Sequence, residues 1–166
     1  KHVLPVFILD PKLLYSEWKS EKRLGFLFAS LHELAKSIQA RGGKLIIRQG
    51  EPDVVLRELV NEGGIERIFA ERDISPYARG RDEMIAQSLP LTLTPGLMFH
   101  QPEDVLKQDG TPYTVFTPYS RAWQKATITN YQFSAPDNIS FTEDVSSDPI
   151  PNHPPHSLES YFPAGE

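Results

Sequence analysis

Short runs of apolar residues alternate with longer polar stretches through the first 95 residues of the chain. The clearest run extends from Val3 to Leu9, is continuous rather than alternating, and stops at Asp10-Pro11. Continuous apolar runs of this length are typical of parallel strands that are covered on both faces. The pattern therefore predicts four strands, at 3–9, 44–48, 66–70 and, with fewer apolar residues, 91–94.

Helically spaced apolar residues separate these runs. They recur at intervals of three and four over about 24–40, which predicts a long helix, and Gly42-Gly43 is placed to end it. Pro52 is placed to open a helix over 54–62, and another helix is expected over about 78–88. Strands that alternate with helices in this way indicate right-handed crossovers. We therefore expect an α/β fold with a doubly wound, open parallel sheet of the Rossmann-like or flavodoxin-like type.

The composition excludes several classes of protein. The 166 residues include no Cys, which excludes a disulfide framework, a zinc finger, an iron–sulfur cluster and a cysteine nucleophile. The lack of Cys also suits a reducing, cytoplasmic location. No apolar run approaches the ~18 residues that a membrane-spanning helix needs, so we expect no membrane partner.

Charge and proline change near residue 127. Residues 1–125 carry 17 basic and 16 acidic side chains, whereas 126–166 carry six acids and no base, a balance that disfavours independent binding of nucleic acid. Six of the 15 prolines follow Ala135, a density that is incompatible with helix or central strand. We therefore expect an α/β domain over 1–126 and an acidic, Pro-rich interdomain connector, or a strap over a surface, over 127–166.

Ligands of doubly wound sheets bind beyond the carboxyl ends of the strands, where the strand order reverses. That rule selects four segments: Leu9-Asp10, Gln49-Gly50, Glu71-Arg72-Asp73 and Thr94-Pro95-Gly96. None of them matches a GxGxxG fingerprint or a P-loop. In Glu71-Arg72-Asp73 the acids either cap the next helix, with Arg72 paired to one of them, or Arg72 and Asp73 bind a ligand. Arg23, just ahead of the long helix, belongs either to a solvated face or to the ligand site.

A histidine pair and an aromatic stretch also stand out in the sequence. His153 and His156 form the one close histidine pair, but no third ligand accompanies them in the connector, so we expect no metal site. The aromatic stretch 113–123 is too long and too apolar for a free loop. We expect it to pack on a core or on another domain.

Five sequence motifs follow one another along residues 3–125. The motifs are Leu4-Pro-Val-Phe-Ile-Leu-Asp-Pro11, Arg23-Leu-Gly-Phe-Leu-Phe-Ala-Ser-Leu31, Gly43-Lys-Leu-Ile-Ile-Arg-Gln-Gly-Glu-Pro52, Glu71-Arg-Asp-Ile-Ser-Pro-Tyr-Ala-Arg-Gly-Arg-Asp82 and Gly110-Thr-Pro-Tyr-Thr-Val-Phe-Thr-Pro-Tyr-Ser-Arg-Ala-Trp123. Together they resemble the N-terminal α/β domain of DNA photolyases and cryptochromes. Relative to that family, the sequence lacks the first strand, which would lie centrally in the sheet, and the first helix.

The resemblance implies a partner and a reaction. In the family this domain joins a C-terminal helical domain that binds FAD. The whole enzyme uses blue light to drive electron transfer from reduced FAD to a cyclobutane pyrimidine dimer in UV-damaged DNA. FAD and the lesion pocket would lie outside these residues, so we expect no catalytic residue in this chain and no repair by the chain alone.

The resemblance also implies a second, light-harvesting antenna chromophore. Folate-binding members have an Asn-Glu pair where this chain has Pro76-Tyr77, which favours a flavin or deazaflavin over a folate. Carried over by motif, the family's antenna site falls on seven residues: Phe7, Leu9, Asp10, Arg23, Arg72, Asp73 and Ala78.

Three functions remain open at this point. The leading one is the antenna-binding domain of a deoxyribodipyrimidine photolyase. The alternatives are a fragment of a cryptochrome blue-light photoreceptor and a free-standing flavin- or nucleotide-binding α/β module. The connector-like tail counts against the last.

Overall fold

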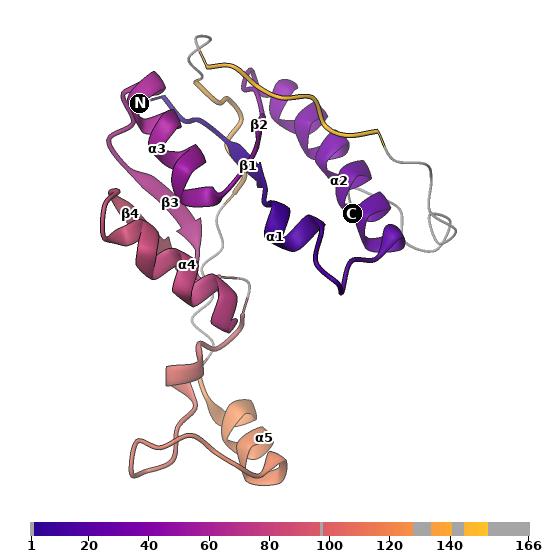
Figure 1. The fold of residues 1–166 in the computed structure, drawn as a ribbon. Helices are drawn as coiled ribbons and strands as arrows, with labels where there is room; N and C mark the ends of the chain where they lie inside the picture. The colour runs from indigo at the N-terminus through magenta and orange to yellow at the C-terminus, as the bar shows by residue number, and fades with distance from the viewer. Residues whose placement is uncertain (1, 97, 128–133, 141–144, 153–166) are drawn as a thin grey trace.

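The computed structural model describes residues 2–96, 98–127, 134–140 and 145–152. The chain alternates short strands with helices, as the apolar pattern predicts (Figure 1). The elements are β1 (Val6–Leu9), α1 (Pro11–Leu14), α2 (Glu21–Gln39), β2 (Ile46–Gln49), α3 (Pro52–Gly63), β3 (Ile68–Glu71), α4 (Pro76–Ala86), β4 (Leu91–Thr94), the 3-10 helix η1 (Pro102–Asp104) and α5 (Phe116–Lys125).

Local chemistry sets the helix boundaries. Pro52 and Pro76 occupy the first turns of α3 and α4, so both helices begin two residues earlier than the apolar pattern predicts. Ser75 caps α4 by accepting a hydrogen bond from the backbone N–H of Ala78 at 3.3 Å. Gly64, with φ 59°, ends α3 in the left-handed conformation that glycine adopts without steric cost.

The strands β1 and β2 form a parallel pair, in register from Val6↔Ile46 to Leu9↔Gln49, with a hydrophobic core on each face. One core joins Leu9 and Ile47 to Phe28 and Leu31 of α2. The other joins Ile46, which is fully buried, to residues of α3. Because successive residues of a strand point to opposite faces, two cores require a continuous apolar run. The predicted strand type is therefore confirmed for β1 and β2.

The strands β3 and β4 form a second parallel pair, in register from Ile68↔Leu91 to Glu71↔Thr94. Among the described residues this pair shares no hydrogen-bonded ladder with β1–β2, so the expected single sheet is present as two two-stranded halves. Phe69 on β3 is 64% exposed, because its side of the pair is not covered.

Part of the segment that was predicted to be a connector packs against the α/β body. The backbone N–H of Asp148 donates to the carbonyl of Ile47 at 2.8 Å, and Ser147 Oγ accepts from the N–H of Ile47 at 2.9 Å. Val145 is 4% exposed and completes the core on the α3 side. The described residues 145–152 therefore pack against β2. The division at residue 127 itself stays a prediction.

Residues 98–127 form a smaller lobe that projects from the α/β body and contains η1 and α5 (Figure 1). The aromatic stretch 113–123 lies largely in α5, and no described residue of α5 is buried. In the part of the chain that the structure describes, no helix is long and apolar enough to cross a membrane.

The packing of Val145 gives a first prediction. Val145→Ala should lower the free energy of unfolding by about 1 to 3 kcal/mol, because it removes buried methyl groups and leaves a cavity beside Ile46. Val54→Ala, at a position on α3 that is 50% exposed, is the matched control and should change it by less than about 0.5 kcal/mol. Urea denaturation measures both. Equal effects of the two substitutions would show that residues 145–152 add nothing to the core.

Candidate functional site

Asp10 is a buried carboxylate at the carboxyl end of β1, with 4% of its surface exposed. Its Oδ1 accepts a hydrogen bond from the N–H of Lys12 at 2.9 Å, which caps α1. Its Oδ2 accepts from the hydroxyl of Tyr77. Both carboxylate oxygens are thus engaged, one within the β1–α1 loop and one with the start of α4. Asp10 therefore positions neighbouring elements.

The Tyr77–Asp10 hydrogen bond joins the two halves of the sheet. Tyr77 lies in the first turn of α4, which follows β3, and Asp10 follows β1. Burial, together with the hydrogen bond to the Asp10 carboxylate and its charge, raises the pKa of Tyr77 to about 12. The phenol therefore stays protonated and keeps donating to Asp10 at alkaline pH values at which a free tyrosine ionises.

The Glu71-Arg72-Asp73 segment supports the next helix and also contacts the projecting lobe. Asp73 Oδ1 accepts from the N–H of Ser75 at 2.8 Å, and this backbone hydrogen bond lowers the pKa of Asp73. The guanidinium of Arg72 lies 2.5 Å from Oε1 of Glu103 in η1 and lowers the pKa of that carboxyl. Asp73 thus makes the hydrogen bond expected of an acid before a helix. Arg72 pairs with an acid of the lobe, instead of with its own neighbours.

The remaining predicted residues lie at different depths. Leu9 is 2% exposed within the core on the α2 side, and Phe7 packs against the same core. Ala78, in the first turn of α4, is 1% exposed. Arg23, at the start of α2, is exposed and donates to the carbonyl of Trp18.

The structure therefore brings Asp10 and the start of α4 together through Tyr77, and it ties Arg72 and Asp73 to other partners. The sequence patterns do not select Tyr77 as a site residue, although its place in the first turn of the helix that follows the third strand is a usable signal. The loop after β4 is adjacent to the loop after β3. At Gly96 an added Cβ would clash with the carboxylate of Glu71.

An open cleft of about 300 Å³ lies between the start of α3 and the side of α4 that runs from Pro76 to Met84. Its apolar walls include Pro52 and Met84, and Tyr77 also borders it. Two cations and two acids line it, including Lys12 and Glu51, whose charged atoms lie 3.3 Å apart. A cleft with apolar walls and a few polar groups suits a small, flat, partly polar molecule.

No group of three or more potential metal ligands occurs among the described residues. The pair His153 and His156 lies outside them.

Comparison with known proteins gives a single family. A family model described as DNA photolyase matches residues 1–137. The chain is 31% identical over 130 residues to a deoxyribodipyrimidine photo-lyase from Synechococcus sp., covering 74% of this chain and 26% of that protein. It is 29% identical over 160 residues to a deoxyribodipyrimidine photo-lyase from Streptomyces griseus, covering 90% of this chain and 34% of that protein. The chain spans about a quarter to a third of these relatives' lengths.

Solved structures share the fold. A bacterial class III photolyase from Agrobacterium tumefaciens matches with a TM-score of 0.77 and 21% identity, over 98% of this chain and 33% of that one. A cryptochrome from Synechocystis sp. matches with a TM-score of 0.76 and 20% identity, over 98% of this chain and 35% of that one. An archaeal photolyase from Sulfolobus tokodaii with two FAD molecules matches with a TM-score of 0.59 and 22% identity, over 86% of this chain and 32% of that one.

The raised pKa of Tyr77 predicts a pH-dependent contribution to stability. Tyr77→Phe should lower the free energy of unfolding by about 1 kcal/mol at pH 8, a value reduced for the partial exposure of the phenol. A group whose pKa is higher in the folded state contributes stability that is present below its unfolded pKa, about 10, and is lost as the pH rises toward 12.

Thermal unfolding of parent and Tyr77→Phe proteins between pH 8 and 12 measures this effect. The difference between the two should shrink as the pH rises. Tyr15→Phe, at a ring that is 67% exposed, is the control and should show a constant difference. A constant difference for Tyr77→Phe as well would mean that the phenol does not tie α4 to Asp10.

Proposed function

Because the chain belongs to the DNA photolyase family, we propose that it is the antenna-binding α/β portion of a deoxyribodipyrimidine photolyase. The observation that carries the proposal is the match to two relatives named deoxyribodipyrimidine photo-lyase, at 31% and 29% identity. The reaction would be the repair of cyclobutane pyrimidine dimers in UV-damaged DNA, driven by blue light. The chain spans only part of those relatives, so FAD and the lesion pocket would belong to a C-terminal helical domain.

Under this proposal, the residues that carry out repair belong to the helical domain and not to this chain. No catalytic role is assigned to any of its residues, and we propose that the 166-residue chain alone does not repair DNA. Its net charge of −5 suits contact with DNA through the whole protein rather than through this chain alone. The lack of Cys supports a reducing, cytoplasmic location.

We propose that the antenna chromophore binds beyond the carboxyl ends of β1 and β3. The exposed Asp73 and the partly exposed Arg72 would supply polar contacts, and Asp10 would act through Tyr77. Phe7, Leu9 and Ala78 would form the apolar floor, and Arg23 would close the site from α2. These donor and acceptor types, beside apolar strand ends, fit a flat heterocycle with polar edges.

We favour a flavin or deazaflavin antenna over a folate. Pro76-Tyr77 at the start of α4 supports that class, and so does the two-FAD photolyase with the same fold. Such a chromophore, when bound, absorbs light and passes the excitation to the catalytic flavin. The residues of this chain would hold and orient it.

A cryptochrome blue-light photoreceptor is the second candidate. The Synechocystis cryptochrome has nearly the same TM-score as the class III photolyase, 0.76 against 0.77, so the fold does not separate the two functions. Relatives of both kinds match by sequence, but over 130 residues or more the photolyases reported above are 31% and 29% identical, against 25% for a cryptochrome DASH, and this difference supports repair.

Chromophore binding tests the proposed site. Asp73→Ala should raise the dissociation constant of a flavin or deazaflavin at least about tenfold, because a charge-assisted hydrogen bond is lost. Arg57→Ala, at an exposed position of α3, is the control and should leave binding unchanged. Absorbance after reconstitution with flavin, deazaflavin and folate in turn measures loading. Equal loading of the Asp73→Ala and parent proteins would refute the site, and preferential loading with folate would refute the chromophore class.

A further inference from the structure

The helix α5 has a strongly amphipathic sequence but lies on the surface of the lobe. Phe116, Tyr119 and Trp123 follow one another at spacings of three and four, so their side chains form one stripe along the helix. Apolar stripes of this kind stabilise helices in proteins by packing against another element. No described residue of α5 is buried, however.

Among the described residues, the aromatic neighbours that the stripe has outside 113–125 lie at its C-terminal end. The ring of Trp123 meets His100 edge-on at 5.0 Å between centroids and Phe99 at 6.3 Å. At the other end Phe116 is 78% exposed and Val115 is 60% exposed. Tyr119, between the two ends, is 38% exposed and contacts the ring of Tyr113 at 6.2 Å.

The packing around Trp123 is also incomplete. The side chain of His100 is 8% exposed, and its Nε2 has no hydrogen-bond partner among the described residues. Buried polar atoms are nearly always paired, so an unpaired one marks a place where a further group belongs. An open aromatic stripe and an unpaired buried nitrogen thus occur on the same small lobe.

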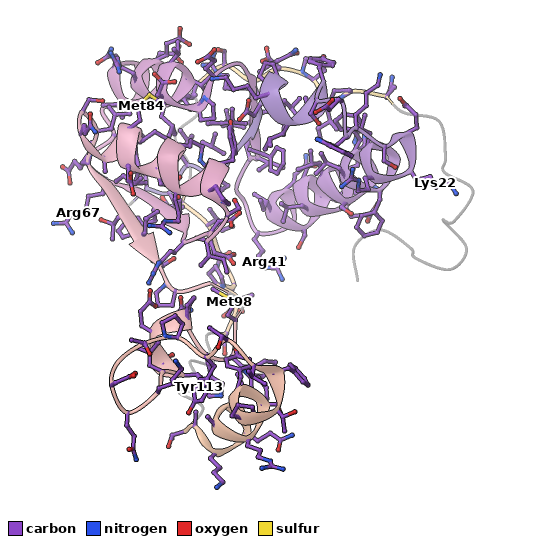
Figure 2. The ribbon with its side chains drawn as sticks, turned by 60° about the horizontal axis from the view of Figure 1, so that its bottom comes forward. Lys22, Arg41, Arg67, Met84, Met98 and Tyr113 are labelled. Carbon is purple, nitrogen blue, oxygen red and sulfur yellow. The ribbon has the colours of Figure 1, made fainter. Side chains whose placement is uncertain are left out.

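The lobe stands where a second domain can reach it. It projects from the α/β body, with Met98 near the junction and Tyr113 within the lobe (Figure 2). Phe116, Tyr119 and Val115 carry no charge, which disfavours nucleic acid as the occupant, because nucleic acid binds basic surfaces. An uncharged stripe on a helix suits the apolar groove of a helical protein.

The length of the relatives indicates which protein that is. The matched region makes up 26% of the Synechococcus photolyase and 34% of the Streptomyces one, so most of each protein lies outside it. We propose that Val115, Phe116 and Tyr119 form the docking surface for the FAD-binding helical domain of a photolyase. This inference rests on the proposed function, and it adds the surface through which the two parts assemble.

Binding in trans tests the docking surface. The partner would be the FAD-containing helical portion of the Streptomyces griseus photolyase, prepared without its α/β portion and titrated with the 166-residue chain by calorimetry. Phe116→Ser should raise the dissociation constant at least about tenfold, since a central aromatic contact is lost. Arg121→Ser, at an exposed position away from the stripe on α5, is the matched control and should change it less than about twofold. Circular dichroism confirms that both variants fold.

The outcomes separate the two proposals. Unchanged binding by Phe116→Ser would overturn the docking surface and leave the proposed function intact. Binding by the Streptomyces enzyme's own α/β portion, but not by the parent chain, would overturn both. Sedimentation showing that the parent chain forms a dimer, and that Phe116→Ser abolishes it, would identify a second copy as the occupant and overturn the inference.

Discussion

The buried carboxylate of Asp10 is the constraint on which the arrangement of the site depends. It ends β1, caps α1 and accepts a hydrogen bond from Tyr77 of α4, so one side chain fixes three elements. Because the two strand pairs share no ladder among the described residues, this hydrogen bond between the end of β1 and the first turn of α4 helps to hold the two halves together. Because both oxygens of Asp10 are engaged, the groups left for a ligand are those of the surrounding loops.

The parts of the chain differ in how well they are packed. The pair β1–β2 has a core on each face, and Val145 closes one of them. The pair β3–β4 and the lobe are more exposed, as Phe69 and Phe116 show. We infer that the better-packed half stabilises the fold, that both halves would contribute residues to the proposed chromophore site, and that the lobe would serve assembly.

Much of the fold follows from local patterns, and most of the site does not. Apolar runs locate the strands, and Pro52 opens α3 as the sequence predicts. The contacts that define the site join residues distant in sequence: Tyr77 and Asp10 are 67 positions apart, and Arg72 and Glu103 are 31 apart. The spacing of apolar residues along the sequence does not indicate which distant residues form such pairs. The helix α1 was also missed, because its four residues are too few for a periodic pattern.

Energy transfer tests the central claim most directly. The 166-residue chain, loaded with a flavin or deazaflavin and assembled with an FAD-containing helical partner, would be given thymine-dimer DNA, and the repair rate recorded against wavelength. The account predicts a repair spectrum that contains the absorption band of the antenna, and no repair by the loaded chain alone. A spectrum identical to that of FAD, with the antenna bound, would contradict it.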